Sequence, residues 1–251
     1  MKDLRPYISS RLFTVVAAIA KSRNEPAYVI GGYVRDILLE RECKDIDIVV
    51  VGDGIAFAQQ VAERLGNHHD ARYYGQFGTA MIRYQDKVVE FVGARKESYQ
   101  HLSRKPEVST GTLEDDQKRR DFTINAFAIS LNETDYGQLI DPFLGLNDLS
   151  KGILRTPLDA DITYSDDPLR MMRAIRFASQ LHFYIDEPTW QGIRNNVERI
   201  RIISQERITD ELNKILLSEK PSVGLDLLYK CGLMHIVFPQ MVDLAGAEYK
   251  D

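Results

Sequence analysis

The chain has 251 residues, 44% of them hydrophobic, and carries 32 Lys and Arg against 37 Asp and Glu. A chain of this length buries a substantial core and approaches the size at which cores divide into domains. The net charge of -5 argues against a uniformly basic nucleic-acid-binding surface, so an anionic partner must meet local clusters of arginine. Cys43 and Cys231 lie far apart without metal-ligand spacing, which excludes a disulfide scaffold and indicates a reducing, cytoplasmic environment.

The first 20 residues resemble either a short signal peptide or an amphipathic helix. Basic residues precede the apolar segment 12–20, as they do in signal peptides. Ile8, Leu12, Val15 and Ile19 instead have the spacing of a helix that packs on a domain, and we favour this interpretation. No run reaches the roughly 18 apolar residues of a membrane span, and nothing in the sequence indicates a protein partner.

Strands and helices alternate in the first 95 residues. The pattern predicts a strand at 26–30, a helix at 33–41, a strand at 45–51, a helix at 54–65 closed by Gly66, and strands at 78–84 and 87–95. These elements indicate a sheet with inserted helices.

The remainder of the chain changes character twice. Residues 100–116 are polar and contain Pro106 and Gly111, so we expect a mobile connector there. We expect a helix-forming stretch at 117–131 and a strand end with turns at 139–157. The chain then becomes helical, with segments at 167–181, 189–200, 204–218 and 221–232. The sequence therefore predicts two domains, residues 1–150 and residues 151–251.

Two glycines, Gly31 and Gly32, separate the first strand from its helix. Glycine lets the backbone approach a phosphate, and the start of a helix offers unpaired N–H groups. Arg35, one turn into the helix, could reach the same anion. A tight turn with a surface arginine is the alternative, and these residues taken alone favour it.

Asp45 and Asp47 are two residues apart on the second strand and so project from one face, about 6 to 7 Å apart. Two carboxylates held this way can share Mg²⁺, which bridges nucleotide phosphates and activates an attacking hydroxyl. Glu90, in the middle of an apolar strand, is a candidate third catalytic carboxylate if its strand lies beside this one. A strand with one solvent-exposed face and no catalytic role remains the alternative.

The segment "RRDFTINA", residues 119–126, places Arg119 and Arg120 ahead of Asp121 and Asn125. Arginine suits phosphate, and the two polar residues suit ribose hydroxyls. Composition alone does not distinguish this candidate nucleotide site from a capped helix start.

Three arginines, Arg170, Arg173 and Arg176, follow one face of the predicted helix at 167–181, opposite an apolar face. Asp167 before Pro168 suits a helix N-cap, but it could also accept a hydrogen bond from a nucleobase while Arg170 donates to it. Paired readout of this kind discriminates bases by roughly 1 to 3 kcal/mol. A solvated arginine row is the alternative.

Taken together, "GGYVRD", "DID", "RRDFTINA", "DDPLRMMRAIRFA" and "SQERITDEL" occur in an order that resembles the class II tRNA nucleotidyltransferase and bacterial poly(A) polymerase family, which includes CCA-adding enzymes. The resemblance covers about residues 28–211. It implies an α+β fold, with a polymerase β-like nucleotidyltransferase head containing a mixed sheet, followed by an all-helical neck.

The resemblance also implies roles for individual residues. Asp45 and Asp47 would hold Mg²⁺, while Gly32, Arg35 and Arg120 would contact the triphosphate. Asp167 and Arg170 would pair with the base of CTP or ATP, supported by Arg173 and Arg176. The implied reaction adds CMP and AMP to the 3′ end of tRNA.

The chain departs from the family pattern in three places. Asp166 stands before Asp167 where Glu is usual, and Glu40 stands where a glycine is common. The chain ends at Asp251, so we expect that a helical body and tail, or an HD domain, are missing.

Two alternatives remain open at this level. The same motifs fit a poly(A) polymerase, or an enzyme that adds only C or only A. A catalytically silent nucleotide- or RNA-binding module is the alternative from another functional class, and the intact aspartate pair argues against it.

Overall fold

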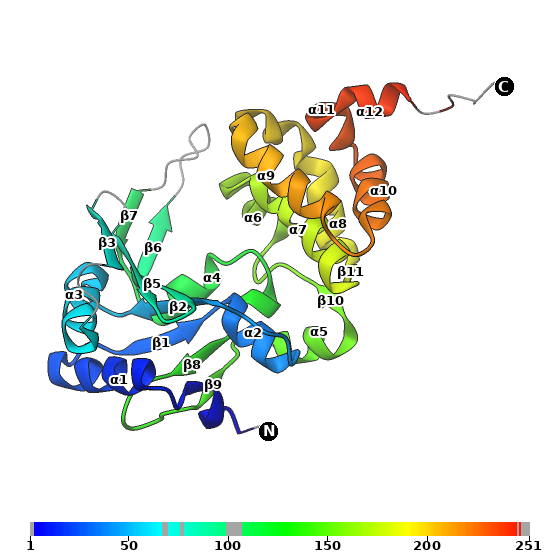
Figure 1. Ribbon diagram of the computed structural model, residues 1–251. Coiled ribbons are helices and arrows are strands. Elements are labelled where there is room, and N and C mark those ends of the chain that lie inside the picture. The colour runs from blue at the N-terminus through cyan, green and yellow to red at the C-terminus, as the bar shows by residue number, and fades with distance from the viewer. Residues whose placement is uncertain (1–2, 67–69, 76–77, 99–106, 245, 247–251) are drawn as a thin grey trace. The chain divides into compact units, whose positions relative to one another are not determined.

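The computed structural model describes residues 3–66, 70–75, 78–98, 107–244 and 246. The chain divides into two compact units (Figure 1). Residues up to 98 together with 107–146 form the first unit, and the second contains residues 147–251.

The first unit is a sheet with helices. Its helices are η1 (Arg5–Ile8), α1 (Arg11–Arg23), α2 (Gly32–Leu38), α3 (Gly54–Leu65), α4 (Leu113–Lys118) and η4 (Thr123–Asn125). Its strands are β1 (Ala27–Ile30), β2 (Asp45–Val50), β3 (Ala71–Tyr74), β4 (Thr79–Tyr84), β5 (Lys87–Gly93), β6 (Arg95–Ser98), β7 (Glu107–Thr110), β8 (Ala128–Ser130) and β9 (Leu139–Ile140).

Within the described residues, seven strands form one mixed sheet in the order β3-β4-β5-β2-β1-β8-β9. β2 and β5 run parallel, with Asp47 directly opposite Glu90. The other neighbouring pairs of this sheet are antiparallel. β6 and β7 form a separate antiparallel pair.

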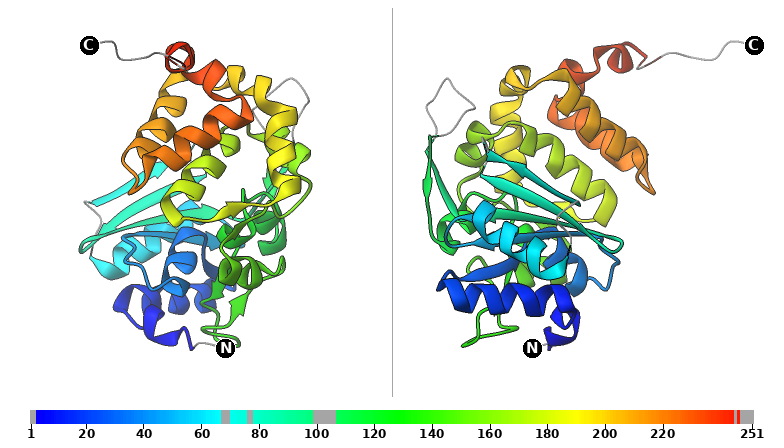
Figure 2. Two further views of the ribbon diagram at one scale, coloured as in Figure 1. Left: turned by 90° about the vertical axis from the view of Figure 1, so that its right-hand side faces the viewer. Right: turned by 60° about the vertical axis from the view of Figure 1, so that its left-hand side comes forward.

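Helices α1 and α3 cover one face of this sheet, as Figure 2 shows from further directions. Phe57 of α3 contacts Phe91 of β5, with ring centroids 6.1 Å apart, and Ile46 and Ile48 of β2 are fully buried. Because side chains alternate along a strand, Asp47 and Glu90 project from the opposite face.

That opposite face has a small apolar cluster of its own. Ile30, Val49, Ala94 and Ala128 are buried together, and Leu113 at the start of α4 packs against them. The cluster fixes α4 on the face from which the β2 aspartates project.

The second unit is mainly helical. It contains the end of α5 (Gly145–Lys151), β10 (Ile153–Leu154), α6 (Ala160–Asp166), α7 (Leu169–Leu181), β11 (Tyr184–Ile185), α8 (Glu187–Asn196), η5 (Val197–Ile202), α9 (Gln205–Leu216), α10 (Pro221–Cys231), α11 (Met234–Val237) and α12 (Pro239–Asp243). α7 is central, because it packs on α9 and α10 and buries Met171, Met172 and Ile175 completely. We expected this unit to be entirely helical, but β10 and β11 form a short parallel pair of strands.

The N-terminal α-helix is shorter than the predicted pattern of apolar residues from Ile8 to Ile19. Ile8 belongs to η1, and α1 buries Leu12, Val16 and Ile19, while Val15 is only half-buried. Within the described residues, no helix has the length and apolar character needed to cross a bilayer.

Two local predictions between residues 100 and 131 are wrong. Part of the expected connector lies outside the described residues, but β7 and the start of α4 fall within 107–116. The expected helix at 117–131 does not form, because α4 ends at Lys118 and β8 pairs with β1. Ile129 is fully buried in the sheet, so tertiary pairing overrides the local helix propensity of this segment.

The segment 139–157 was expected to hold a strand end and turns. The strand end is present as β9, but α5 forms between the turns. Asp141 helps to start it, because its carboxylate accepts hydrogen bonds from the backbone N–H groups of Gly145 and Leu146 at 2.8 and 2.9 Å.

Candidate active site

Gly31 lies between β1 and α2 in a conformation that other residues rarely adopt, with φ 78° and ψ -135°. A Cβ at this position would lie 3.1 Å from Nη1 of Arg120 and 3.3 Å from Oδ2 of Asp47. A Cβ at Gly32 would lie 3.6 Å from Nη2 of Arg35. The glycine pair therefore leaves space beside two guanidinium groups and a carboxylate.

Asp45 and Asp47 share one face of β2, where Asp45 is exposed and Asp47 half-buried. Glu90 lies beside Asp47 on the neighbouring parallel strand, in direct register. The pKa of Glu90 is raised, first by partial loss of solvent and next by the charge of Asp47, while Arg120 and Arg95 oppose the shift. Glu90 is exposed by surface area, so this loss of solvent is incomplete.

Within the described residues, no group of three or more His, Cys, Asp or Glu side chains is arranged to hold a metal ion. Glu90 lies opposite Asp47 on the neighbouring strand, and its catalytic role stays a prediction. The pair alone suits Mg²⁺, which is usually held by one or two carboxylates, with water and substrate phosphates filling the other positions.

Arg119 and Arg120 are both bound by Asp116, a residue that our sequence prediction missed. Arg120 donates to Oδ2 of Asp116 from Nε at 3.1 Å and from Nη2 at 2.9 Å. Arg119 donates to Oδ1 from Nε at 3.0 Å and also from Nη2. Burial raises the pKa of Asp116, but the two guanidinium groups more than offset it and the net pKa is lowered. The acid therefore stays ionised.

Arg35 is more enclosed than expected, with 8% of its surface exposed. Its Nε and Nη2 donate to the carboxylate of Asp36 at 2.9 and 3.0 Å, and its Nη1 donates to Oδ1 of Asn125 at 2.7 Å. Nδ2 of Asn125 in turn donates to Oδ1 of Asp121 at 3.0 Å. Arg35, Asn125 and Asp121, which were predicted separately as nucleotide-binding residues, lie in one hydrogen-bonded group, and much of their hydrogen bonding is internal.

In the second unit, Asp167 lies between α6 and α7. Its Oδ1 accepts a hydrogen bond from the backbone N–H of Leu169 at 3.1 Å, and its Oδ2 accepts one from Nη2 of Arg207 at 3.4 Å. Arg170 donates from Nη1 to the carbonyl of Thr163 at 3.4 Å. The N-cap position of α7 falls on Pro168 rather than on Asp167, but the Asp167 side chain still accepts a hydrogen bond at the start of this helix, and its carboxylate is held from α9 as well.

The row of arginines on α7 is half-buried along its length. Nε of Arg176 lies 3.0 Å from Oε2 of Glu211 on α9, and both side chains are nearly enclosed. The guanidinium carbons of Arg173 and Arg176 lie 5.4 and 4.3 Å from the centroid of the Phe177 ring. This row is not a simple solvated face, and Arg176 joins α7 to α9.

Sequence reasoning missed four partners of the predicted arginines and aspartates: Asp36, Asp116, Arg207 and Glu211. Asp116 could have been found from its spacing, because residues three and four apart on a helix are neighbours. The interactions of Arg207 and Glu211 with α7 are long-range and have no local signal, although both belong to the motif "SQERITDEL".

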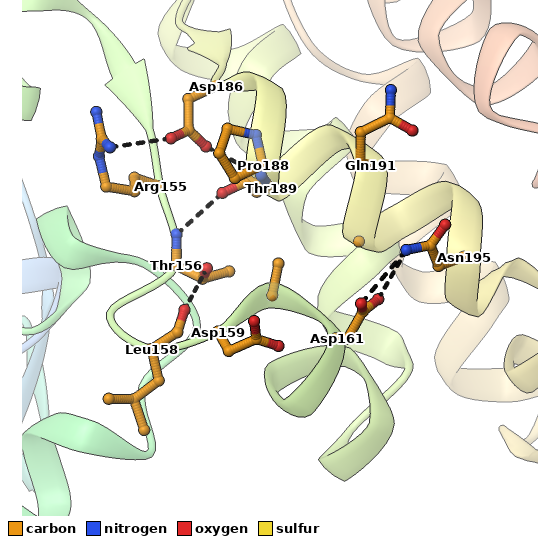
Figure 3. A pocket seen from close by; sticks show the side chains of 12 residues that line it. Arg155, Thr156, Leu158, Asp159, Asp161, Asp186, Pro188, Thr189, Gln191 and Asn195 are labelled. Carbon is orange, nitrogen blue, oxygen red and sulfur yellow. Dashed lines mark hydrogen bonds and ion pairs between the residues drawn. The ribbon is translucent and has the colours of Figure 1, made fainter.

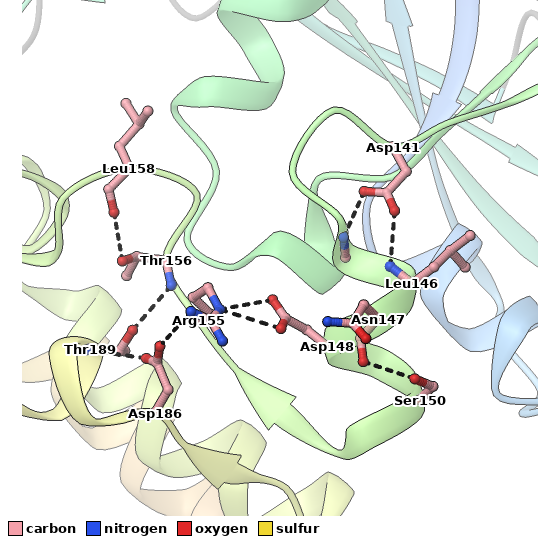
Figure 4. Close-up of polar contacts among 11 residues, drawn as sticks. Asp141, Leu146, Asn147, Asp148, Ser150, Arg155, Thr156, Leu158, Asp186 and Thr189 are labelled. Carbon is pink, nitrogen blue, oxygen red and sulfur yellow. Dashed lines mark hydrogen bonds and ion pairs between the residues drawn. The ribbon is translucent and has the colours of Figure 1, made fainter.

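A separate cavity of about 260 Å³ lies in the second unit beside α8 (Figure 3). Arg155 pairs there with Asp186 at 3.1 Å, and Asn195 donates to Asp161 at 3.2 Å. Arg155 also pairs with the buried Asp148 at 3.2 Å (Figure 4). These pairs join α6 to α8, and they join the residue after β10 to α5 and to the start of α8. None of the predicted site residues lines the cavity.

Comparison with known families bears directly on this arrangement. Residues 27–155 match the family described as the poly A polymerase head domain. The chain belongs to this family. Residues 182–244 match a second family, described as the probable RNA and SrmB-binding site of polymerase A. The resemblance inferred from the motifs is therefore confirmed.

Individual relatives agree with the family assignment. The A-adding tRNA nucleotidyltransferase of Aquifex aeolicus is 39% identical over 207 residues, which cover 81% of this chain and 24% of the relative. The CCA-adding enzyme of Lactobacillus helveticus is 40% identical over 191 residues, which cover 75% of this chain and 45% of the relative. The chain thus spans between a quarter and a half of the length of these relatives.

Solved structures confirm the predicted fold class of a polymerase β-like head followed by a helical region. The Thermotoga maritima CCA-adding enzyme complexed with tRNA has a TM-score of 0.81 at 31% identity, covering 99% of this chain and 57% of that chain. A CCA-adding enzyme complexed with ATP has a TM-score of 0.80 at 33% identity, covering 98% of this chain and 55% of that chain.

Proposed function

We propose that this protein is a template-independent nucleotidyltransferase that transfers CMP and AMP from CTP and ATP to the 3′ end of tRNA. The observation that carries the proposal is the convergence of Asp47 and Arg120 on the space left by Gly31. This places a carboxylate and a cation at one point of a head domain whose relatives are named as CCA-adding and A-adding enzymes.

The first unit supplies the groups that such a transfer needs. Asp45 and Asp47 would hold Mg²⁺, which when bound assists attack by the RNA 3′ hydroxyl and stabilises the leaving pyrophosphate. Arg120 offsets the charge of the triphosphate, and Gly31 lets the phosphates approach the backbone. Burial disfavours the charged form of Arg120, but the nearby carboxylates of Asp116 and Asp47 reverse this, so its pKa is raised and it remains a cation.

The second unit supplies candidate groups for choosing the base. Asp167 would accept a hydrogen bond from the exocyclic amino group that cytosine and adenine share, and Arg170 would donate to ring acceptors. The bonds from Leu169 and Arg207 hold the Asp167 carboxylate in place. A fixed acceptor discriminates better than a mobile one, because fewer alternative pairings are open to it.

The proposal is tested by incubating the protein with tRNA that lacks its CCA end, CTP and ATP, and measuring product length. Addition of three nucleotides that then stops supports CCA addition. Asp47→Ala should abolish incorporation while the melting temperature stays close to that of the wild type. Unchanged incorporation by this variant would contradict the metal-binding role.

A second candidate is an enzyme that adds only A. The relative from Aquifex aeolicus carries that name and is as similar as the CCA-adding relatives. Acceptor tRNA ending in CC separates the two, because an A-adding enzyme extends it but leaves tRNA without the two C residues unchanged. Long A tails would instead indicate a poly(A) polymerase, and binding without any incorporation would indicate a silent module.

A cytoplasmic location is part of the proposal. Cys43 and Cys231 are both free thiols, which fits a reducing compartment.

A further inference from the structure

We propose that Asp116 is a positioning residue that holds the guanidinium of Arg120 beside Gly31 and Asp47, and thereby sets the affinity for the triphosphate. This inference rests on the proposed function, because it concerns the same nucleotide site. It assigns a role to a residue that lies outside the glycine turn, the aspartate strand and the helix of arginines.

The contacts of Asp116 are those of a rigid support. The residue has no exposed surface, and each of its oxygens accepts hydrogen bonds from one arginine. Arg120 uses Nε and Nη2 for these bonds. Its remaining nitrogen, Nη1, is the atom that lies 3.1 Å from the Cβ position at Gly31. The side of the guanidinium bound by Asp116 is therefore opposite the side directed at the glycine.

Asp116 is itself fixed by the helix that carries it. Thr112 and Asp115 form a capping box at the start of α4, with hydrogen bonds of 2.9 and 3.2 Å between side chain and backbone. The side chain of Gln117, next to Asp116, donates to the carbonyl of Ala126 at 2.7 Å. The start of this short helix and the residue next to its end are thus both held in place, one on each side of Asp116.

The charges favour a role toward an anion. Asp116 is ionised and faces two guanidinium groups, so the three side chains together carry one excess positive charge. The pKa of Asp116 is lowered and that of Arg120 is raised, in each case by the partner in spite of burial. A cation held in this way needs no reordering when phosphate arrives, and this lowers the entropic cost of binding.

The test measures binding without catalysis. Equilibrium dialysis with labelled CTP in the presence of Mg²⁺, and competition by inorganic tripolyphosphate, give the two affinities. We compare the wild type with Asp116→Asn, Arg120→Ala and the double variant. Loss of the charged contact should weaken both ligands roughly tenfold in Asp116→Asn. Because Asp116 acts through Arg120, the double variant should bind no more weakly than Arg120→Ala alone.

Glu114→Gln is the matched control. It changes an exposed acid on the same helix that pairs with Lys118 at 2.7 Å and takes no part in holding Asp116, so it should leave both the melting temperature and tripolyphosphate binding nearly unchanged. Asp116→Glu is the second variant in case Asp116→Asn does not fold. It keeps the charge but displaces the guanidinium by about one bond length, and we expect weaker tripolyphosphate binding with little change in melting temperature.

The outcomes separate the inference from the proposed function. Additive losses in the double variant, or full affinity in a folded Asp116→Asn or Asp116→Glu protein, would overturn the positioning role and leave the function intact. Absence of CTP and tripolyphosphate binding by the wild type would instead overturn the nucleotide site itself.

Discussion

Replacement of Gly31 by alanine tests the geometry on which the site depends. The new methyl group would occupy the space between Nη1 of Arg120, at 3.1 Å, and Oδ2 of Asp47, at 3.3 Å. Both distances are shorter than ordinary van der Waals contacts, so at least one of the two polar groups must move by a few tenths of an ångström. The backbone conformation, with φ 78°, is also one that alanine rarely adopts.

The strain in the backbone and the displacement of the two polar groups differ in size and in their consequences. Holding alanine in this backbone conformation costs about 1 to 3 kcal/mol. A loss of about 2 kcal/mol lowers the melting temperature of a protein of this size by about 4 to 8 °C. The displacement of Arg120 and Asp47 adds little to unfolding, but it acts on the groups that would bind phosphate and metal. We therefore expect incorporation to fall at least tenfold, more than the fraction of unfolded protein explains.

Gly66→Ala is the matched control. Gly66 also has a positive φ, 75°, but a Cβ there meets nothing within 4 Å. This variant should lose stability without losing nucleotide incorporation. The assay pairs a thermal melt with incorporation of labelled CMP into tRNA that lacks CCA, for both variants at a temperature well below the melts. Full incorporation by Gly31→Ala, or an equal loss in both variants, would refute the reasoning.

Three further predictions concern other residues. Arg170→Ala should reduce the preference for CTP and ATP over UTP and GTP by roughly tenfold or more while tripolyphosphate affinity is kept, and equal losses for all nucleotides would count against base reading. Glu90 has a raised pKa in the folded state, so its contribution to stability is present at low pH and is lost as pH rises through that pKa. Glu90→Gln should therefore stabilise the protein relative to wild type at pH 7 and less so at pH 4 in urea unfolding. Glu211→Ala removes one partner of a nearly enclosed ion pair and should cost about 3 to 5 kcal/mol, whereas Lys214→Ala on the same helix, with an exposed side chain, should cost less than about 1 kcal/mol.

Most helices and strands of the first 95 residues follow from local signals in the sequence, although β3 (Ala71–Tyr74) was not predicted. Asp53 caps α3 by accepting hydrogen bonds from the N–H groups of Ile55 and Ala56, and Gly66 closes the helix in a left-handed conformation. The β-branched residues of β2 and β5 form strands, and their parallel pairing places Glu90 beside Asp47. The caps and the strand-forming residues act within a few positions, which is why the sequence indicates them. The pairing of β2 with β5 joins segments that are far apart in the chain, and the sequence left it open.

The segment 107–131 has structure that local signals do not predict. Strand β8 forms because it pairs with β1, which lies about 100 residues earlier in the chain. Glu40 is a smaller case. Its φ of 56° is in the left-handed region that favours glycine, which is the residue that the family resemblance led us to expect there. The backbone at this position is determined by the fold, and the residue accepts it at some cost.

The candidate site shows the same difference between features that local sequence signals indicate and features that depend on other parts of the chain. The sequence leads to a proposal for the residues that would meet a nucleotide, but it did not indicate what holds them. Asp36 binds Arg35, Asp116 binds Arg120, and Glu211 binds Arg176. Only the first two are near in sequence to their partners. Paired arginines of this kind look like a solvated row or a capped turn when only their spacing is known.

The net negative charge of the chain is compatible with an anionic substrate because of these pairs. An arginine loses side-chain entropy when it becomes ordered on a phosphate, by up to about 2 kcal/mol. An acid that orders the arginine during folding moves that cost from binding to folding. Acids must therefore accompany such arginines, so a protein can carry more acidic than basic residues and still present ordered cations at one site. The double-variant comparison at Asp116 and Arg120 tests this division of cost directly, because it separates the affinity for tripolyphosphate from the stability of the fold.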